Sequence, residues 1–256
     1  MKRFYMVAIS VLLLASSSCE ELWPPTSTRE LWRGAVRIGD ILSSPSSYEG
    51  KDVTVVGYYR GWDLFGEAGC GPPLTRSDIA IADATGGIYV VGVERIKGIE
   101  ELSPFSLYDT DRLFKVKGVV RVSASKCPYI EAMEGGAVEG LPVGVVLRAR
   151  RMGGIAAFDE ELMVMDSGAA RYLDRRARKI SDISMGREEV SRALNILRIL
   201  PLGEIGSPIP DGFSYMFIFW EDGGIRTVKL HEIQLPRDAE ELREILNGWL
   251  SKARGG

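Results

Sequence analysis

The sequence is poor in the residues on which nucleophilic catalysis and metal binding most often depend. It has a single histidine, His231, and three cysteines, Cys19, Cys70 and Cys127. A serine or cysteine nucleophile needs a base beside it, and His231 lies near the end of an expected strand without a recognisable motif. So few cysteines and histidines also make a poor ligand set for a metal ion. We therefore expect a protein that is not an enzyme and that holds no cofactor or metal.

Three further features are missing. No glycine-rich phosphate-binding loop precedes a helix. The net charge of −3 lacks the basic excess of typical nucleic-acid-binding proteins, which argues against nucleic acid as a partner. The apolar run Met6 to Ala15 is shorter than the roughly 20 residues that a membrane-spanning helix needs. What is abundant is glycine, with 29 residues, which favours many tight turns and hence β structure.

The N-terminus has the parts of an export signal. Lys2 and Arg3 precede the apolar run Met6 to Ala15, and three serines then lead to Cys19. This pattern resembles the signal of bacterial or archaeal-type lipoproteins, in which the cysteine is lipidated and becomes the new N-terminus. The resemblance implies that residues 1–18 are removed and that the protein is extracytoplasmic and anchored to the cell membrane by lipid. The alternatives are an ordinary cleaved signal and an uncleaved N-terminal anchor.

The remaining two cysteines suit an oxidising compartment. If Cys19 carries lipid, Cys70 and Cys127 form an even pair, and a single disulfide is the expected pairing. It would close a loop of roughly 57 residues and stabilise the protein by about 4 kcal/mol in the chain-entropy model. Two unrelated buried thiols are the alternative. Residues 19–34 have no hydrophobic periodicity, so we expect them to be a tether.

Residues 35–142 are expected to form an all-β domain. Apolar residues alternate along five short runs after a short helix at Ile38, and the expected strands are Val53 to Tyr59, Asp78 to Asp83, Ile88 to Gly92, Phe114 to Ser123 and Pro128 to Met133. Gly57 and Gly118 stand in mid-strand, where glycine permits the sharp bends of a small barrel. The strand spacing resembles an OB-fold, a five-stranded Greek-key barrel. A β-sandwich is the alternative.

The resemblance to OB-folds implies a place for a ligand, on strands two and three and the loops beside them. Six residues in this part combine aromatic rings with charges and are the candidate ligand-binding residues, namely Tyr59, Trp62, Phe65, Arg76, Asp78 and Tyr89. Aromatic rings would suit single-stranded nucleic acid, but Asp63, Glu67 and Asp83 oppose a basic groove. The alternative is that these rings pack in the barrel, because aromatic side chains fill small cores well.

Residues 143–256 are expected to form a second, α+β domain after a glycine-rich boundary at residues 135–144. The pattern indicates three strands from Val145 onward, a helix over Arg187 to Leu200, a hairpin around Asp222 and a closing helix after Pro236. The expected order is therefore βββαββα. The basic run Arg171 to Lys179 is expected to be a solvated face, and contact with anionic lipid head groups is the alternative.

Short segments of this second domain resemble emfourin, a family of small inhibitors of thermolysin-like metalloproteases. They are Gly153-Gly154, the stretch PDGFSY at residues 210–215, the Asp222-Gly223 turn and the leucine-rich closing helix. The resemblance implies protease inhibition as an alternative function, with a metalloprotease as partner. The main hypothesis is a non-enzymatic, lipid-anchored binding module that holds a protein or glycan of the cell envelope. A structural role, in which the barrel only holds the second domain away from the membrane, is a further alternative.

Overall fold

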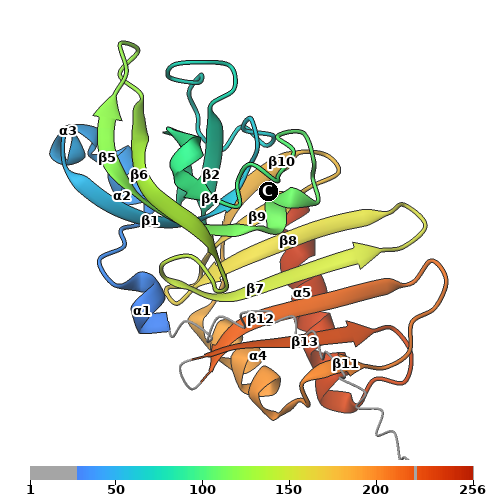
Figure 1. Cartoon of the computed structure of the whole chain (residues 1–256). Coiled ribbons are helices and arrows are strands. Elements are labelled where there is room, and N and C mark those ends of the chain that lie inside the picture. The colour runs from blue at the N-terminus through green and yellow to red at the C-terminus, as the bar shows by residue number, and fades with distance from the viewer. Residues whose placement is uncertain (1–27, 222–223, 256) are drawn as a thin grey trace, which may run out of the picture.

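The first half of the chain closes into a five-stranded mixed barrel (Figure 1). The computed structural model describes residues 28–221 and 224–255, so the expected signal peptide and Cys19 lie outside the described residues. The barrel strands are β1 (Asp52–Tyr59), β2 (Ile79–Asp83), β3 (Gly86–Val91), β5 (Leu113–Val122) and β6 (Pro128–Val138). Neighbours in the order β3-β2-β1-β5-β6 are antiparallel, and a parallel pairing of β3 with β6 closes the ring. A closed ring of this kind is consistent with an OB-like barrel and differs from the two separate sheets of a sandwich.

Glycine permits the barrel to close where the sequence predicts bends. A Cβ atom on Gly118 would lie 2.3 Å from the carbonyl oxygen of Glu131, beside a register shift between β5 and β6. A Cβ atom on Gly57 would lie 3.0 Å from the carbonyl oxygen of Ala82. Neighbouring strands therefore approach too closely for larger residues at these two positions, which confirms the sequence-based expectation.

A buried aspartate joins the β2–β3 turn to the helices that precede the barrel, α2 (Ile38–Ser43) and α3 (Pro45–Tyr48). One carboxylate oxygen of Asp83 accepts hydrogen bonds from the backbone N–H groups of Thr85 and Gly86, at 2.7 and 3.1 Å. The other accepts from the N–H of Ile38 at 2.8 Å. Burial raises the pKa of Asp83 above its usual value, although these bonds oppose the shift. The turn is thus fixed from inside the fold.

Between β3 and β5 the chain makes short elements, η1 (Val93–Arg95), β4 (Ile96–Lys97) and η2 (Asp109–Asp111). β4 adds a parallel edge to β6. Residues 98–112 form the loop that leads back to β5, and η2 is the only regular element within it. This loop becomes important for the candidate site.

The second half is one seven-stranded sheet with two helices. Its elements are β7 (Val145–Gly153), β8 (Phe158–Met165), β9 (Ala169–Asp174), β10 (Lys179–Ser184), α4 (Arg187–Ile199), β11 (Gly203–Ile205), β12 (Phe213–Glu221), β13 (Gly224–His231) and α5 (Arg237–Gly255). The strand order is β10-β9-β8-β7-β12-β13-β11. The expected order βββαββα is therefore wrong in detail, because β10 and β11 are additional strands. Among the described residues, no helix combines the length and apolar character needed to cross a membrane.

The expectation of a solvated basic face at Arg171 to Lys179 is also only partly right. Arg171 and Arg175 are buried, whereas Arg176, Arg178 and Lys179 are exposed. The run is the β9–β10 hairpin, in which Arg171 pairs with Asp182 across the two strands at 2.9 Å. The side chains of a strand point alternately to the two faces of its sheet, so a cluster of charges in sequence is divided between the faces in the fold.

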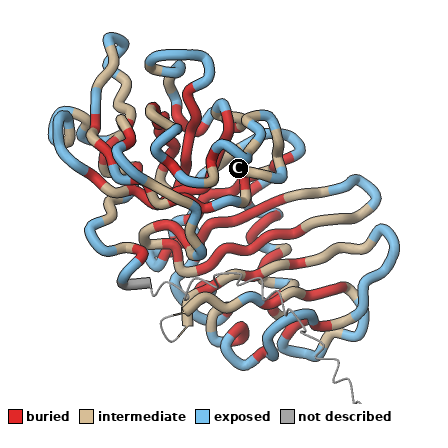
Figure 2. The backbone as a smooth tube through the Cα atoms, viewed as in Figure 1, coloured by how far each residue is buried: buried red, intermediate tan, exposed pale blue. Residues whose placement is uncertain are grey.

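The molecule has three layers, which are the barrel, the seven-stranded sheet and the helix pair α4–α5. One face of the sheet packs its apolar side chains on α4 and α5. The other face packs on the barrel, and Met163 and Met165 of β8 belong to the same core as Val56 and Tyr58 of β1. The buried stretches of backbone are concentrated in the barrel strands and the middle of the sheet, while the turns at the sheet's ends are exposed (Figure 2). We call residues 35–138 the barrel lobe and residues 145–255 the sheet lobe.

A short helix, α1 (Thr28–Trp32), lies where both lobes meet. Leu31 is fully buried there, and the indole N–H of Trp32 donates to the carbonyl oxygen of Leu141 at 2.9 Å. The ring of Trp32 also meets the ring of Trp220 edge-on, at 5.9 Å between centroids. The last part of the segment expected to be a tether is therefore packed against the fold.

Candidate functional site

The disulfide expected from the sequence is present and holds one of the barrel loops. Cys70 and Cys127 are bonded, with their Cα atoms 6.2 Å apart. Cys70 lies in the long loop between β1 and β2, and Cys127 comes directly before β6. The bond therefore ties the middle of that loop to the residue that leads into β6, and the alternative of two separate thiols is wrong.

An exposed aromatic pair lies where the β1–β2 loop crosses the 98–112 loop. The ring centroids of Trp62 and Phe105 are 4.5 Å apart in an edge-to-face arrangement, and the two side chains are 39% and 63% exposed. The backbone N–H of Trp62 donates to the carbonyl oxygen of Pro104 at 3.3 Å. Gly61 has a positive φ, and a Cβ atom there would collide with the same carbonyl oxygen. We call Trp62 and Phe105 the aromatic platform.

The other predicted site residues do not join this platform as one ligand face. Tyr59 points into the barrel core and packs on Phe114, and burial raises its pKa to about 12. Tyr89 packs with Ala68, Ala80 and Tyr129 in a small separate cluster.

Asp78, Phe65 and Arg76 have different surroundings again. Asp78 accepts hydrogen bonds from the backbone N–H groups of Leu74 and Thr75, at 2.7 and 2.9 Å, and so shapes its own loop. Phe65 is buried against the guanidinium of Arg60, and Arg76 is exposed. Of the six candidates, only Trp62 and Arg76 therefore present an exposed side chain.

Sequence reasoning missed Phe105 and the neighbouring Tyr108, which is 90% exposed. Both lie in a stretch that the sequence identified only as a connection between strands. The local signal was only that two aromatic residues, Phe105 and Tyr108, lie close together in one expected connection. It was weak on its own, since no spacing rule pairs residue 105 with residue 62.

Near the end of the loop that carries Phe105, a carboxylate of the barrel lobe is held by three arginines of the sheet lobe. Asp111, in η2, accepts hydrogen bonds from Arg148 and Arg150 of β7 and, at 2.8 Å, from Arg175 of the β9–β10 turn. Burial favours the neutral acid, but attraction to Arg148, Arg175 and Arg150 outweighs it and lowers the pKa of Asp111. The carboxylate is therefore ionised at neutral pH and ties the two lobes together.

Glu161 of β8 completes this arrangement from inside the sheet lobe. Its side chain has no exposed surface, and one carboxylate oxygen accepts from Arg148 and Arg175, each at 2.6 Å. Burial opposes its ionisation, yet the two arginines hold its pKa well below the usual value. The Nε of Arg150 donates to the carboxylate of Asp159 at 2.6 Å. Each of the three arginines thus has a carboxylate partner from its own sheet as well as Asp111.

The network extends to the β1–β2 loop through Arg60, which is fully buried. Its Nε donates to Glu67 and its Nη1 donates to the carbonyl oxygen of Thr110, at 2.5 and 2.9 Å. Arg175 also donates to the hydroxyl of Thr110. Burial raises the pKa of Glu67, although attraction to Arg60 opposes this shift. We call the set Arg60, Glu67, Asp111, Arg148, Arg150, Asp159, Glu161 and Arg175 the interlobe network.

The single histidine lies in a chain of polar contacts at the far edge of the sheet lobe. His231 Nδ1 is 3.2 Å from the hydroxyl of Ser214, and its Nε2 is 3.3 Å from the carboxylate of Glu204. A serine, an imidazole and a carboxylate in line form the pattern of a nucleophilic triad. Glu204, however, is 62% exposed and pairs with Lys229 at 2.8 Å, and that bond lowers its pKa. Water and Lys229 thus compete with the imidazole for the carboxylate of Glu204. The contacts of His231 link the three adjacent strands β11, β13 and β12.

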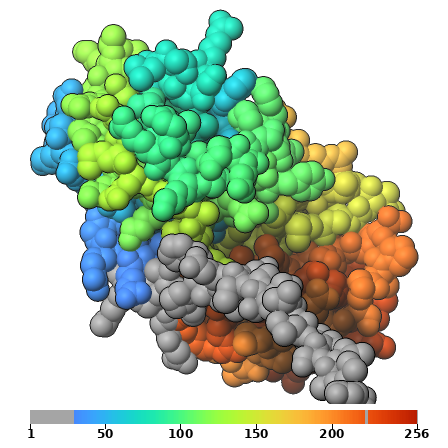
Figure 3. Space-filling view, viewed as in Figure 1, coloured from blue at the N-terminus to red at the C-terminus, as the bar shows by residue number. Residues whose placement is uncertain are grey.

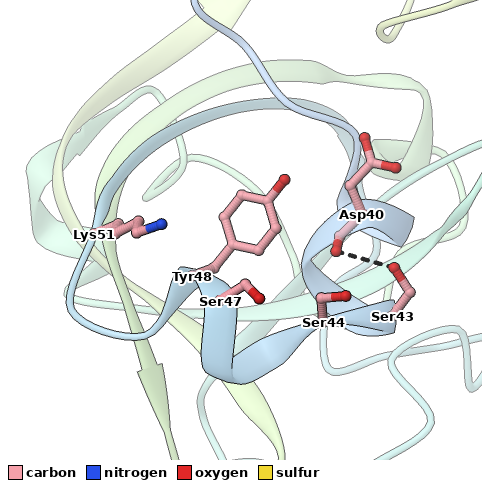
Figure 4. A pocket seen from close by; sticks show the side chains of 6 residues that line it. All are labelled: Asp40, Ser43, Ser44, Ser47, Tyr48 and Lys51. Atoms are coloured by element: carbon pink, nitrogen blue, oxygen red, sulfur yellow. Dashed lines mark hydrogen bonds between the residues drawn. The ribbon is translucent and has the colours of Figure 1, made fainter.

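A polar pocket of about 470 Å³ lies at the outer corner of the barrel (Figure 4). Hydroxyl groups predominate in its lining, which consists of Asp40, Ser43, Ser44, Ser47, Tyr48 and Lys51. None of the six is buried, and Arg37 neutralises Asp40 with a hydrogen bond of 2.9 Å. Exposed charges are screened by water, so this pocket offers a small ligand little binding energy.

Packing accounts for the two glycines and the start of strand β12 behind the resemblance to emfourin, while the Asp222-Gly223 turn lies outside the described residues. A Cβ atom on Gly153 would lie 2.3 Å from the carbonyl oxygen of Gly212, and one on Gly154 would lie 2.7 Å from the ring of Phe213. The ring of Phe213 lies 5.9 Å from that of Phe158, measured between centroids. These residues therefore fit one another within the sheet lobe and do not form a separate site.

We compared the chain with models of protein families and with curated proteins, and nothing matches it in either comparison.

Proposed function

We propose that this protein is a non-enzymatic binding module of the cell envelope, and that it binds its partner at the aromatic platform. The observation that carries the proposal is the pair Trp62–Phe105, exposed on two loops that are fixed from below. Aromatic side chains that lie together on the surface are typical of binding sites, and Trp and Tyr are enriched among the residues that contribute most to binding. The partner we propose is a protein or a glycan, with no nucleic acid and no cofactor.

The same proposal includes the OB-like character of the barrel and the resemblance of the sheet lobe to emfourin. An OB-fold binds ligands on its second and third strands and on the loops after its first and fourth strands. Trp62 lies on the first of these loops, and Phe105 reaches it from the loop that follows the third barrel strand. The emfourin-like character of the sheet lobe supports a second proposal, inhibition of a thermolysin-like metalloprotease. Since the motif residues pack on one another, they give that alternative no site of its own, and we place binding at the barrel loops first.

Site-specific photo-crosslinking tests the platform in native membranes. A benzoylphenylalanine in place of Tyr108, which is 90% exposed on the same loop, should form a discrete adduct. The same probe in place of Ile155, which is 92% exposed in the sheet lobe, is the matched control and should form none. Trp62→Ala should reduce the adduct from position 108 about thirtyfold, because a central aromatic contact is worth roughly 2 kcal/mol or more and about 1.4 kcal/mol is a factor of ten.

Mass spectrometry and glycan staining of the adduct then distinguish a protein from a glycan. Equal labelling from positions 108 and 155, or an adduct that Trp62→Ala leaves unchanged, would contradict the platform as the binding site.

Lipidation of Cys19 is the part of the proposal that places the protein at the membrane. Each buried CH₂ of an acyl chain contributes about 0.8 kcal/mol to membrane binding, so loss of the lipid should release the protein. We expect Cys19→Ala to move the protein from the membrane fraction to the soluble extracytoplasmic fraction. Cys70→Ala, which removes the disulfide and leaves Cys19 in place, should stay with the membrane. Unchanged membrane retention of the Cys19→Ala variant would count against lipidation.

A further inference from the structure

Both loops that carry the aromatic platform begin or end in the interlobe network. Trp62 follows Arg60, whose guanidinium is fully buried between Glu67 and Thr110. Phe105 lies on the loop that ends at Thr110 and Asp111. The segment that carries Phe105 is thus fixed to the sheet lobe through Thr110 and Asp111. The segment that carries Trp62 is fixed within the barrel lobe, through Arg60 to Glu67 and Thr110.

Apolar burial alone does not hold the outer part of the 98–112 loop. Ile99 is buried at its beginning, but Phe105 and Tyr108 are exposed. Within the loop, the N–H of Ser103 donates to Asp109 at 2.8 Å, which gives local shape without an attachment to the rest of the molecule. The attachments at the far end are Thr110 and Asp111. Asp111 is held by Arg148, Arg150 and Arg175 of the sheet lobe. Thr110 bonds to Arg175 of the sheet lobe and also to Arg60 of the barrel lobe.

We propose that Asp111 is a positioning residue, through which the sheet lobe holds the 98–112 loop so that Phe105 meets Trp62. This inference rests on the proposed binding role of the platform. It assigns the sheet lobe a part in ligand binding without contact to the ligand. In the space-filling view, the green segment that contains this loop lies directly against the yellow strands of the sheet lobe (Figure 3). Three arginines on one carboxylate also fix its direction, since each guanidinium presents its donors in a planar fork.

Hydrogen exchange of the full chain tests the positioning without any ligand. Asp111→Asn keeps the size of the side chain and removes its charge, so the bonds from the arginines weaken. We expect roughly tenfold faster exchange of amides in residues 98–112, with the strands of the barrel unchanged, because the loss of charged hydrogen bonds opens this segment locally. Asp111→Glu should restore the protection, because it keeps the charge and the carboxylate is 33% exposed, which leaves room for one more methylene.

Asp182→Asn is the matched control. It removes another carboxylate that pairs with a buried arginine, Arg171, but Asp182 is 70% exposed and lies on β10. We expect no change in residues 98–112. The photo-crosslinking yield from position 108 gives the second measurement, and Asp111→Asn should lower it about tenfold while Asp182→Asn leaves it unchanged.

Unchanged loop exchange in Asp111→Asn would overturn the inference, and so would faster exchange spread evenly over both lobes. Faster loop exchange with an unaltered crosslinking yield would overturn it as well. If Asp111→Asn does not fold, Arg150→Gln, which removes one of the three donors to Asp111, replaces it in both measurements with the same expectations. If the unaltered chain forms no adduct at all, the proposed function fails, whereas the exchange measurement still decides whether Asp111 holds the loop.

Discussion

Glu161 is the residue whose ionisation should matter most for stability. It has no exposed surface and lies between the guanidinium groups of Arg148 and Arg175. Glu161→Gln removes the charge and leaves two buried arginines short of a partner, which should lower the free energy of unfolding by about 3–5 kcal/mol. Glu131→Gln, at an exposed pair with Arg121, is the control and should cost no more than about 1 kcal/mol. Denaturant unfolding at pH 7 measures both changes, and similar losses in the two variants would contradict a special role for Glu161.

The stabilisation by ionised Glu161 depends on pH in a definite direction. The pKa of Glu161 is lower in the folded protein than in the unfolded chain, so the unfolded chain binds the proton first as pH falls. The stabilisation is complete above the ordinary pKa of about 4.3 and disappears as pH decreases through the folded value. Asp111 acts with the same sign, whereas the raised pKa of Glu67 acts with the opposite one. Glu161→Gln should therefore show a shallower loss of stability in acid than the unaltered protein.

At the same scale, the sequence could predict residue types for a site but not the side on which each residue lies. β1 alternates as expected, with Tyr59 in the barrel core and Tyr58 on the outer wall. The outer wall is covered by the sheet lobe, so both tyrosines are buried. Alternation separates two faces of a strand, and it cannot tell whether the second face meets water or another layer. For this reason Tyr59 was as good a candidate from sequence as Trp62.

At the scale of elements, the strands with regular apolar alternation were predictable and the charged or short ones were not. Strands β1, β2, β3 and β5 and the turn between β2 and β3 follow the expected spacing closely. β6 runs to Val138, past the expected end at Met133 and into the glycine-rich stretch expected to be the boundary, because it pairs with β5 along this length. β10 was missed because Lys179 and Asp182 make it look like a surface loop, although Arg171 on β9 pairs with that same aspartate. β11 has only three residues, which is too few for any periodicity. Its place in the sheet is decided by pairing with β13, a contact that is distant in sequence.

The candidate site was predictable in part for the same reason. The disulfide followed from counting cysteines, and Trp62 followed from its place in a long loop beside Cys70. Phe105, Asp111 and the arginines of β7 become neighbours only when the sheet lobe packs on the barrel. Long-range packing of this kind leaves no local pattern in the sequence. The expectation of two separate domains, 35–142 and 143–256, described the chain order and not the interactions between the two parts.

At the scale of the whole molecule, the interface between the lobes has an apolar part and an ionic part. In the apolar part, Val56 and Tyr58 belong to the same core as Met163 and Met165. The ionic part is the interlobe network. Separation of the lobes would expose these apolar side chains to water, at about 25 cal/mol per Å² of apolar surface. It would also leave Arg148 and Arg175 without Asp111. A lobe on its own therefore loses part of its core, unlike a domain joined to its neighbour by a tether.

We therefore expect the two lobes to unfold together. Calorimetry of the chain from residue 28 onward should show one transition, with calorimetric and van't Hoff enthalpies that agree. Residues 143–256 expressed alone should lack a cooperative transition, because Met163, Met165 and Arg148 would then face water. Two separate transitions, of which one matches the isolated fragment, would contradict this and would favour the alternative in which the barrel is only a spacer. A single transition would instead mean that the platform on the barrel and the helices behind the sheet depend on the same cooperative structure, as the positioning role of Asp111 requires.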